Sequence, residues 1–252
     1  MKKTLLPSMV VVLIFAAGAF AQTESTARAV TNGAKDPTPA AAITATTSPM
    51  DLARAALAAQ GGEKFKNLKS MILRGSADLY APNSTRAAPG GFVMVIAGDK
   101  LMLDVNAQPI FSLKQIFNGQ QSFSSIPGVE MPPASKFGLP VLAKFDQPGY
   151  TVSALPDNKK KQRSFRIVDS EGNTTDFYLD TATGRVVTCL IPYNGFTFGI
   201  ENSKYKDVEG VLVPFEFSWR LETPQGAYFA EYKVKDVKLN QAIGDDVFAI
   251  PN

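Results

Sequence analysis

The sequence predicts a mainly β protein, built as a single, strongly curved antiparallel sheet with short helices packed on its concave face. From Ser70 onward, apolar and polar residues alternate in runs of strand length, which is typical of half-buried strands. The links between these runs are short and several carry hairpin residues, whereas parallel pairing needs long crossover connections. A single apolar stretch with helical character, residues 132–148, interrupts the series.

Residues 1–21 have the pattern of a cleavable signal peptide. Lys2 and Lys3 precede an apolar run from Leu5 to Phe20, and Ala19-Phe20-Ala21 places small residues where a signal peptidase cuts. The run is shorter than the ~20 residues that a transmembrane helix needs. We expect cleavage after Ala21 and export to the periplasm; the alternative is an uncleaved anchor.

A leader and a short helical region precede the strands. Residues 22–48 are rich in Ala, Thr and Pro, a composition that buries too little apolar surface to fold, so we expect a flexible leader. The folded β domain then spans residues 49–252. A helix begins at Ser48 or Pro49, with Asp51 in its first turn, and ends at Gly61-Gly62. A second helical turn covers residues 63–68.

The strands follow in order, with the clearest pattern near the C-terminus. Gly98-Asp99 and Asn118-Gly119 are hairpin signals. In the run 211–221, apolar residues at odd positions alternate with a largely polar set, so one face is apolar. Pro214 has no amide hydrogen and is expected at a bulge or where no partner strand needs that hydrogen. The expected strands cover residues 70–79, 91–97, 100–106, 116–125, 150–155, 162–168, 174–180, 185–192, 196–206, 211–221 and 227–238.

The interrupting stretch, residues 132–148, is expected to form one or two short amphipathic helices that cover the concave face. Pro140 suits a helix start, and Lys136 and Lys144 are expected on the outer side. The apolar residues of this lid are Phe137, Leu139, Val141, Leu142 and Phe145.

Composition excludes several classes of function. Removal of the 21-residue signal peptide would leave 231 residues. It would also remove two lysines and lower the formal charge from +3 to +1. A nearly neutral chain is not expected to bind nucleic acid. The chain has no histidine and one cysteine, Cys189, which removes the usual zinc ligands, the common general base and any intramolecular disulfide. Cys189 is expected to be a buried structural thiol.

No motif indicates an enzyme or a cofactor. Asp245-Asp246 is a carboxylate pair, but adjacent strand residues point to opposite faces and this pair falls in a terminal turn. The S-x-x-K spacing from Ser203 to Lys206 lies on an expected strand, where residues three apart face opposite sides. We therefore expect a non-catalytic protein without a cofactor.

Aromatic side chains line the apolar face of the last strands. Such residues either pack as a core that fills the concavity or leave part of it open for a ligand. Composition alone leaves both alternatives open. The residues expected to line this face are Phe196, Phe198, Phe215, Phe217, Trp219, Tyr228 and Tyr232.

Three motifs resemble motifs of the LolA-like proteins, the outer-membrane lipoprotein-sorting superfamily. Tyr205-Lys206-Asp207-Val208-Glu209-Gly210-Val211-Leu212-Val213-Pro214 is similar to the family's "Y-x-D-V-x-G-x-x-x-P" hairpin. The ending, with Asn240, Ile243, Asp245 and Phe248, resembles its "N-x-x-I-x-D-x-x-F" close. Ile116-Phe117-Asn118-Gly119-Gln120 is similar to its early "DG-x" hairpin. The resemblance spans Pro49 to Asn252.

The resemblance implies a half-barrel with short helices over an apolar concavity. It implies a periplasmic carrier or binder of a lipid or an acylated lipoprotein, with an inner-membrane donor and an outer-membrane acceptor, and we expect a monomer. The alternative is a non-catalytic envelope protein that has a fully packed sheet and serves structure or interaction. The run Lys159-Lys160-Lys161 with Arg163 is interpreted as a solvated loop; the alternative is docking to anionic headgroups or an acidic partner.

Overall fold

The computed structural model describes residues 43–109, 111–129, 131–156, 162–224 and 226–251. The chain divides into two units, Met1–Thr38 and Pro39–Asn252, and all described residues lie in the second. The expected signal peptide, its cleavage site, most of the leader and the lysine run 159–161 lie outside the described residues. Among those described, no helix combines the length and the apolar character needed to cross a bilayer.

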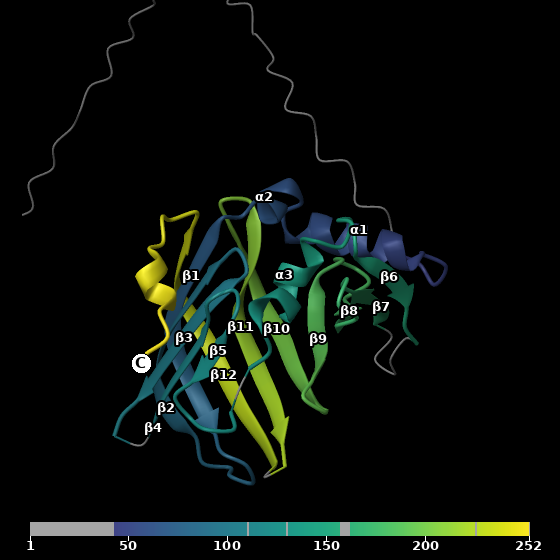
Figure 1. Cartoon of the computed structure of the whole chain (residues 1–252). Coiled ribbons are helices and arrows are strands. Elements are labelled where there is room, and N and C mark those ends of the chain that lie inside the picture. Colours follow the sequence, from purple (N-terminus) through teal and green to yellow (C-terminus); the bar gives the residue numbers. More distant parts are fainter. Residues whose placement is uncertain (1–42, 110, 130, 157–161, 225, 252) are drawn as a thin grey trace, which may run out of the picture. The chain divides into compact units, whose positions relative to one another are not determined.

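Within the described residues, twelve strands form one antiparallel sheet that does not close into a barrel (Figure 1). The order across the sheet is β5-β4-β3-β2-β1-β12-β11-β10-β9-β8-β7-β6. Most neighbours are joined by hairpins, and the C-terminal β12 lies beside β1. The strands are β1 (Ser70–Tyr80), β2 (Ala88–Ala97), β3 (Lys100–Ala107), β4 (Phe111–Phe117), β5 (Ser122–Ser124), β6 (Thr151–Ala154), β7 (Arg163–Val168), β8 (Thr174–Leu179), β9 (Val186–Tyr193), β10 (Phe196–Val208), β11 (Val211–Thr223) and β12 (Gly226–Leu239).

The helices are short and most of them pack on the concave face. In α1 (Pro49–Gln60), Ser48 Oγ accepts a hydrogen bond from the Asp51 amide at 3.2 Å, and Gly61 ends the helix at φ 118°, as capping chemistry predicts. A side chain at Gly61 would meet the Gly210 carbonyl oxygen at 2.4 Å. The others are α2 (Glu63–Lys66), η1 (Ala134–Lys136), α3 (Leu139–Leu142) and η2 (Asp245–Phe248).

The two faces of the sheet carry separate hydrophobic cores. The larger core lies on the concave side, where α1, α2, η1 and α3 pack (Figure 1). A smaller cluster on the opposite face joins Val95 and Ile116 to Phe248 of η2. The predicted fold class, a curved antiparallel sheet with short helices on its concave face, is therefore confirmed, and η2 is an additional turn that covers the outer face.

Two boundaries differ most from the sequence-based expectation. The fourth strand, β4, begins at Phe111, five residues before the expected start, because residues 111–115 already pair with β3. Residues 43–48, assigned to the leader, contact the domain: the Arg163 guanidinium donates hydrogen bonds to the carbonyl oxygens of Thr44 and Thr47, the latter at 3.1 Å. The lid stretch does form two short turns, η1 and α3.

Candidate ligand cavities on the concave face

A first cavity of about 320 Å³ lies between the sheet and the η1–α3 segment. Its inner wall is apolar and comes from β1, β2, β10 and β11. Its outer part is polar and comes from four segments: α2, the α2–β1 link, the β2–β3 turn and the chain after α3. The lining residues used below are Lys66, Lys69, Ser70, Leu73, Met94, Gly98, Asp99, Phe137, Leu139, Ala143, Lys144, Gln147, Cys189, Asn202, Pro214, Phe217 and Trp219.

A second cavity of about 530 Å³ lies farther along the same face. Its walls are the ends of β1, β11 and β12, the β1–β2 loop, and Ile126, Val129 and Met131, which precede η1. Arg86 is its one charged lining residue among those described. The lining includes Leu79, Tyr80, Ser84, Arg86, Ala88, Leu113, Gln115, Val129, Met131, Phe198, Trp219, Leu221, Tyr228, Phe229 and Tyr232.

A cluster of aromatic rings separates the two cavities. Trp219 lines both, and its ring lies 5.1 Å from Phe137 and 5.0 Å from Tyr232 between centroids. Phe217 stacks on Tyr232 at 4.7 Å, and Phe137 contacts Phe198 at 5.2 Å. Rings at these separations attract one another in tilted and edge-on arrangements. The concave face is therefore filled at its middle and open on both sides.

Five of the seven aromatic residues expected on the concave face line these cavities. Phe217 lines the first cavity, and Trp219 lines both. Phe198, Tyr228 and Tyr232 line the second. The other two, Phe196 and Phe215, line neither.

Phe196 and Phe215 are displaced for different reasons. Phe196 begins β10 at the tip of the β9–β10 hairpin and is 37% exposed. Near Phe215 the alternation of β11 breaks: Lys204, which has φ 46°, and Phe215 form no ladder pair between the pairs Ser203–Glu216 and Tyr205–Pro214, although the register of β10 and β11 is the same on both sides. Pro214 lines the first cavity, while Lys206 Nζ lies 4.2 Å over the Phe215 ring.

The pairing of β11 with β12 agrees with the special position predicted for Pro214. Pairing between β11 and β12 starts at Glu216, so no described ladder bond to β12 requires the amide hydrogen that proline lacks. Proline is therefore compatible with this position at the cavity wall.

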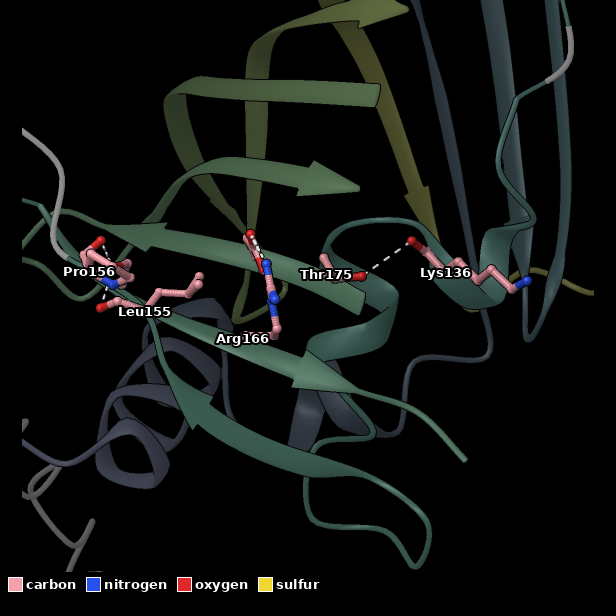
Figure 2. Close-up of polar contacts among 7 residues, drawn as sticks. Lys136, Leu155, Pro156, Arg166 and Thr175 are labelled. Carbon is pink, nitrogen blue, oxygen red and sulfur yellow. Dashed lines mark hydrogen bonds and ion pairs between the residues drawn. The ribbon is translucent and has the colours of Figure 1, made fainter. Parts of the chain in front are cut away.

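The expected lid residues divide into two groups. Phe137 and Leu139 line the first cavity, whereas Val141, Leu142 and Phe145 are buried in the core. Figure 2 shows one attachment of this segment: Thr175 Oγ1 on β8 donates a hydrogen bond to the Lys136 carbonyl oxygen at 3.4 Å. Beside it, Arg166 donates two hydrogen bonds to Asp176, at 2.6 and 2.8 Å, across β7 and β8 (Figure 2).

Ion pairs hold the other end of the lid. Lys144 Nζ pairs with Asp99 in the β2–β3 turn, and Lys66 Nζ on α2 pairs with Asp146 at 2.5 Å. The hydrogen bond between the latter two lowers the pKa of Asp146 and raises the pKa of Lys66. Lys144 was expected on the outer side, and this is wrong: its side chain lines the cavity mouth and is only 24% exposed.

Cys189 is fully buried and lines the first cavity, and burial raises the pKa of its thiol. The buried position agrees with the sequence-based expectation. Among the residues that the structure describes, no three Asp, Glu, Cys or His side chains gather as metal ligands.

The family-like motifs occupy structural turns. Asp207 Oδ1 accepts a hydrogen bond from the Gly210 amide at 3.0 Å in the β10–β11 turn. Asn118 Oδ1 accepts from the amides of Gln120 and Gln121. Asn240 Oδ1 accepts from the Lys69 amide at 3.0 Å. The motifs thus fix hairpins and the C-terminal link, which explains why they indicate a fold.

Solved structures share this architecture. A LolA superfamily protein from Nitrosomonas europaea is 10% identical, with a TM-score of 0.52 over 81% of this chain and 98% of that one. A DUF1329 family protein from Desulfovibrio piger is 8% identical, with a TM-score of 0.50 over the same two shares. No family model matches the sequence, and no curated protein matches it. At such identities the likeness concerns the fold, so the described domain has a LolA-like fold.

Sequence reasoning missed the polar mouth of the first cavity. Lys66 ends α2, Lys69 lies in the α2–β1 link and Asp99 lies in the β2–β3 turn. None of them belongs to a recognisable motif. The one available signal was the count of lysines around the two helical regions. The lysines meet at one cavity only because the sheet brings the β2–β3 turn beside the start of β1, where Ser70 pairs with Ala97.

Proposed function

We propose that this protein is a periplasmic, non-catalytic carrier or binder of a lipid or an acylated lipoprotein. The observation that carries the proposal is the pair of apolar cavities on the concave face, one of them covered by the η1–α3 segment. The LolA-like fold supports a carrier type of protein. The apolar run and cleavage motif in residues 1–21 support export.

The physical basis of the proposal is the burial of acyl chains. Each methylene removed from water contributes about 0.8 kcal/mol, so a long chain gives roughly 10 kcal/mol before the costs of binding. A carrier must hide that chain and later release it. A short helical segment that is held by a few polar contacts on an open sheet suits both requirements.

Native mass spectrometry with lipid extraction, on the mature protein purified from the periplasm, tests this proposal. We expect a discrete added mass that extracts as a fatty acid, a phospholipid or an acylated peptide. A clean ligand-free mass, together with no uptake of a fluorescent fatty acid, would contradict the proposal.

A second candidate is an envelope protein that uses the sheet for structure or interaction. The stacking of Phe217 on Tyr232, and the ring contacts of Trp219, favour a packed core at the middle of the face. This candidate takes the lead if neither cavity admits an apolar ligand.

A further inference from the structure

The first cavity is amphipathic: apart from Asn202 on the inner wall, its polar residues gather at one end. Lys69 and Ser70 lie at the start of β1, and Gly98 and Asp99 form the turn that follows β2. Ser70 pairs with Ala97, so these two segments share one edge of the domain. The Lys144–Asp99 ion pair brings the end of the lid to the same edge.

Among the charged residues that line this mouth, three are lysines and one is an aspartate. We call Lys66, Lys69 and Lys144 the lysine rim. Asp146 and Asp99 pair with the first and the last of them, whereas Lys69 makes no ion pair with an acidic residue in the described part of the chain. Lys66 and Lys144 are each only 24% exposed, so their charges are less screened than those of free surface lysines.

The apolar part continues inward from the rim. From Ser70, the wall passes Leu73 and its partner Met94 and reaches Phe217. Tyr232 pairs with Ala77 on one side and with Phe217 on the other, so Phe217 lies at the height of Ala77 along β1. Seven strand residues span roughly 23 Å. One acyl chain in a bilayer occupies about 15 Å, half of its hydrocarbon core of about 30 Å.

The volume restricts the number of chains. At about 320 Å³, the first cavity lies near the lower limit of about 300 Å³ for ligand pockets. It therefore suits one acyl chain rather than a bundle of two or three.

We propose that the first cavity binds a single-chain amphiphile with an anionic head group, with the chain against Leu73, Met94 and Phe217 and the head group at the lysine rim. The inference rests on the proposed function and adds the ligand class and its orientation. The second cavity, with Arg86 as its one charged lining residue among those described, has no comparable rim.

Binding of three amphiphiles with the same chain tests the inference. Dodecanoate, dodecanol and dodecyltrimethylammonium are titrated below their micelle concentrations into the purified mature protein, and Trp219 fluorescence reports occupancy. Exposed ion pairs contribute modestly, so we expect dodecanoate to bind about fivefold more tightly than dodecanol, and the cation to bind most weakly.

Rim variants sharpen the test. Lys69→Gln breaks no ion pair and should remove most of the preference for dodecanoate while leaving dodecanol affinity unchanged. Asp99→Asn should increase affinity for dodecanoate alone, because it frees Lys144; a variant that merely loosens the lid would change both affinities. Lys238→Gln is the matched control, since Lys238 pairs with Ile72, whose side chain belongs to the cluster on the opposite face.

The outcomes separate the two proposals. Equal affinity for dodecanoate and dodecanol would overturn the anionic head-group site and leave a carrier of apolar ligands standing. Failure of all three amphiphiles to bind would overturn both.

Discussion

The two cavities share one sheet face and one tryptophan, yet they are built differently. The first is covered by η1 and α3 and has the lysine rim at its mouth. The second is larger, about 530 Å³ against 320 Å³, and its walls are strand ends and loops, with Arg86 as the one charged lining residue described. The difference shows that the sheet supplies apolar surface along its whole length. The inserted segment supplies cover at one end, and it supplies charge there together with α2 and the α2–β1 link.

This comparison also assigns different roles to similar residues. Trp219 and Tyr232 meet at the middle of the face, where rings pack as a core, while Tyr228 lies in the wall of the second cavity. A carrier needs both kinds of position. Under the proposed function, the packed middle is the structural core and the open ends are the expected ligand sites.

The largest effect is expected at the boundary between the cavities. Trp219→Ala should lower the free energy of unfolding by about 3–5 kcal/mol, because Trp219 is 6% exposed and contacts four other rings. Chemical denaturation measures the change. Phe196→Ala is the control: at 37% exposure it should cost only about 0.5 kcal/mol. A wild-type unfolding curve for Trp219→Ala would refute a packed boundary.

The next predicted effect compares a lid residue that is buried in the core with a lid residue that lines the first cavity. Leu142 is fully buried, so Leu142→Ala should cost about 2–5 kcal/mol, toward the lower end because leucine leaves a smaller cavity than tryptophan. Leu139 lines the first cavity and is only partly buried. Leu139→Ala should therefore weaken dodecanoate binding with a smaller loss of stability. The same loss of stability in both variants would argue that the lid simply fills the core.

A smaller effect tests whether the cavities are open. Ala143 lines the first cavity and Ala88 lines the second. Ala143→Leu and Ala88→Leu should each change stability by less than about 1 kcal/mol, because the added atoms enter free space; a tightly packed site would lose about 1–3 kcal/mol. Only Ala143→Leu should weaken dodecanoate binding. Destabilisation by both variants would favour the packed-sheet interpretation.

Alternation in the sequence predicted the long strands well because it reports directly which face is buried. In β11, Val211, Val213, Phe217 and Trp219 are buried as expected. The same reasoning failed to place Phe215 because it assumed unbroken strand geometry, whereas Lys204 and Phe215 interrupt the pairing of β10 with β11. Such an interruption depends on both strands, so the alternation of one strand alone does not reveal it.

The lid and the rim show a second limit. Apolar spacing predicted that residues 132–148 pack on the sheet, and Phe137 and Leu142 are buried there. It placed Lys144 outside because charge on a short helix normally faces water. Asp99, its partner, lies 45 residues away in sequence. Pairings over such distances depend on the three-dimensional approach of two turns, so the lysine rim emerges only from the structure.

The smallest predicted effect is on the pH dependence of stability. It compares the Lys66–Asp146 ion pair at the lysine rim with an ion pair on the outer face. Asp146 has a folded pKa below its ordinary value of 3.8, chiefly through its hydrogen bond with Lys66. A carboxyl group with a depressed folded pKa stabilises the fold above its unfolded pKa, and this contribution is lost as pH falls through the folded value. Stability should therefore drop below about pH 3.8 in the wild type and drop less in Asp146→Asn.

Thermal unfolding of both proteins between pH 2 and 6 measures this difference, and the matched control lies on the other face. Asp245 pairs with Lys100 at 2.6 Å, and this also lowers its pKa, but its side chain is 91% exposed. Because solvent screens such a pair, Asp245→Asn should change the loss of stability at acid pH less than Asp146→Asn does. If the two variants changed the pH dependence equally, the Lys66–Asp146 ion pair would be an ordinary surface contact that does not hold the lid over the first cavity.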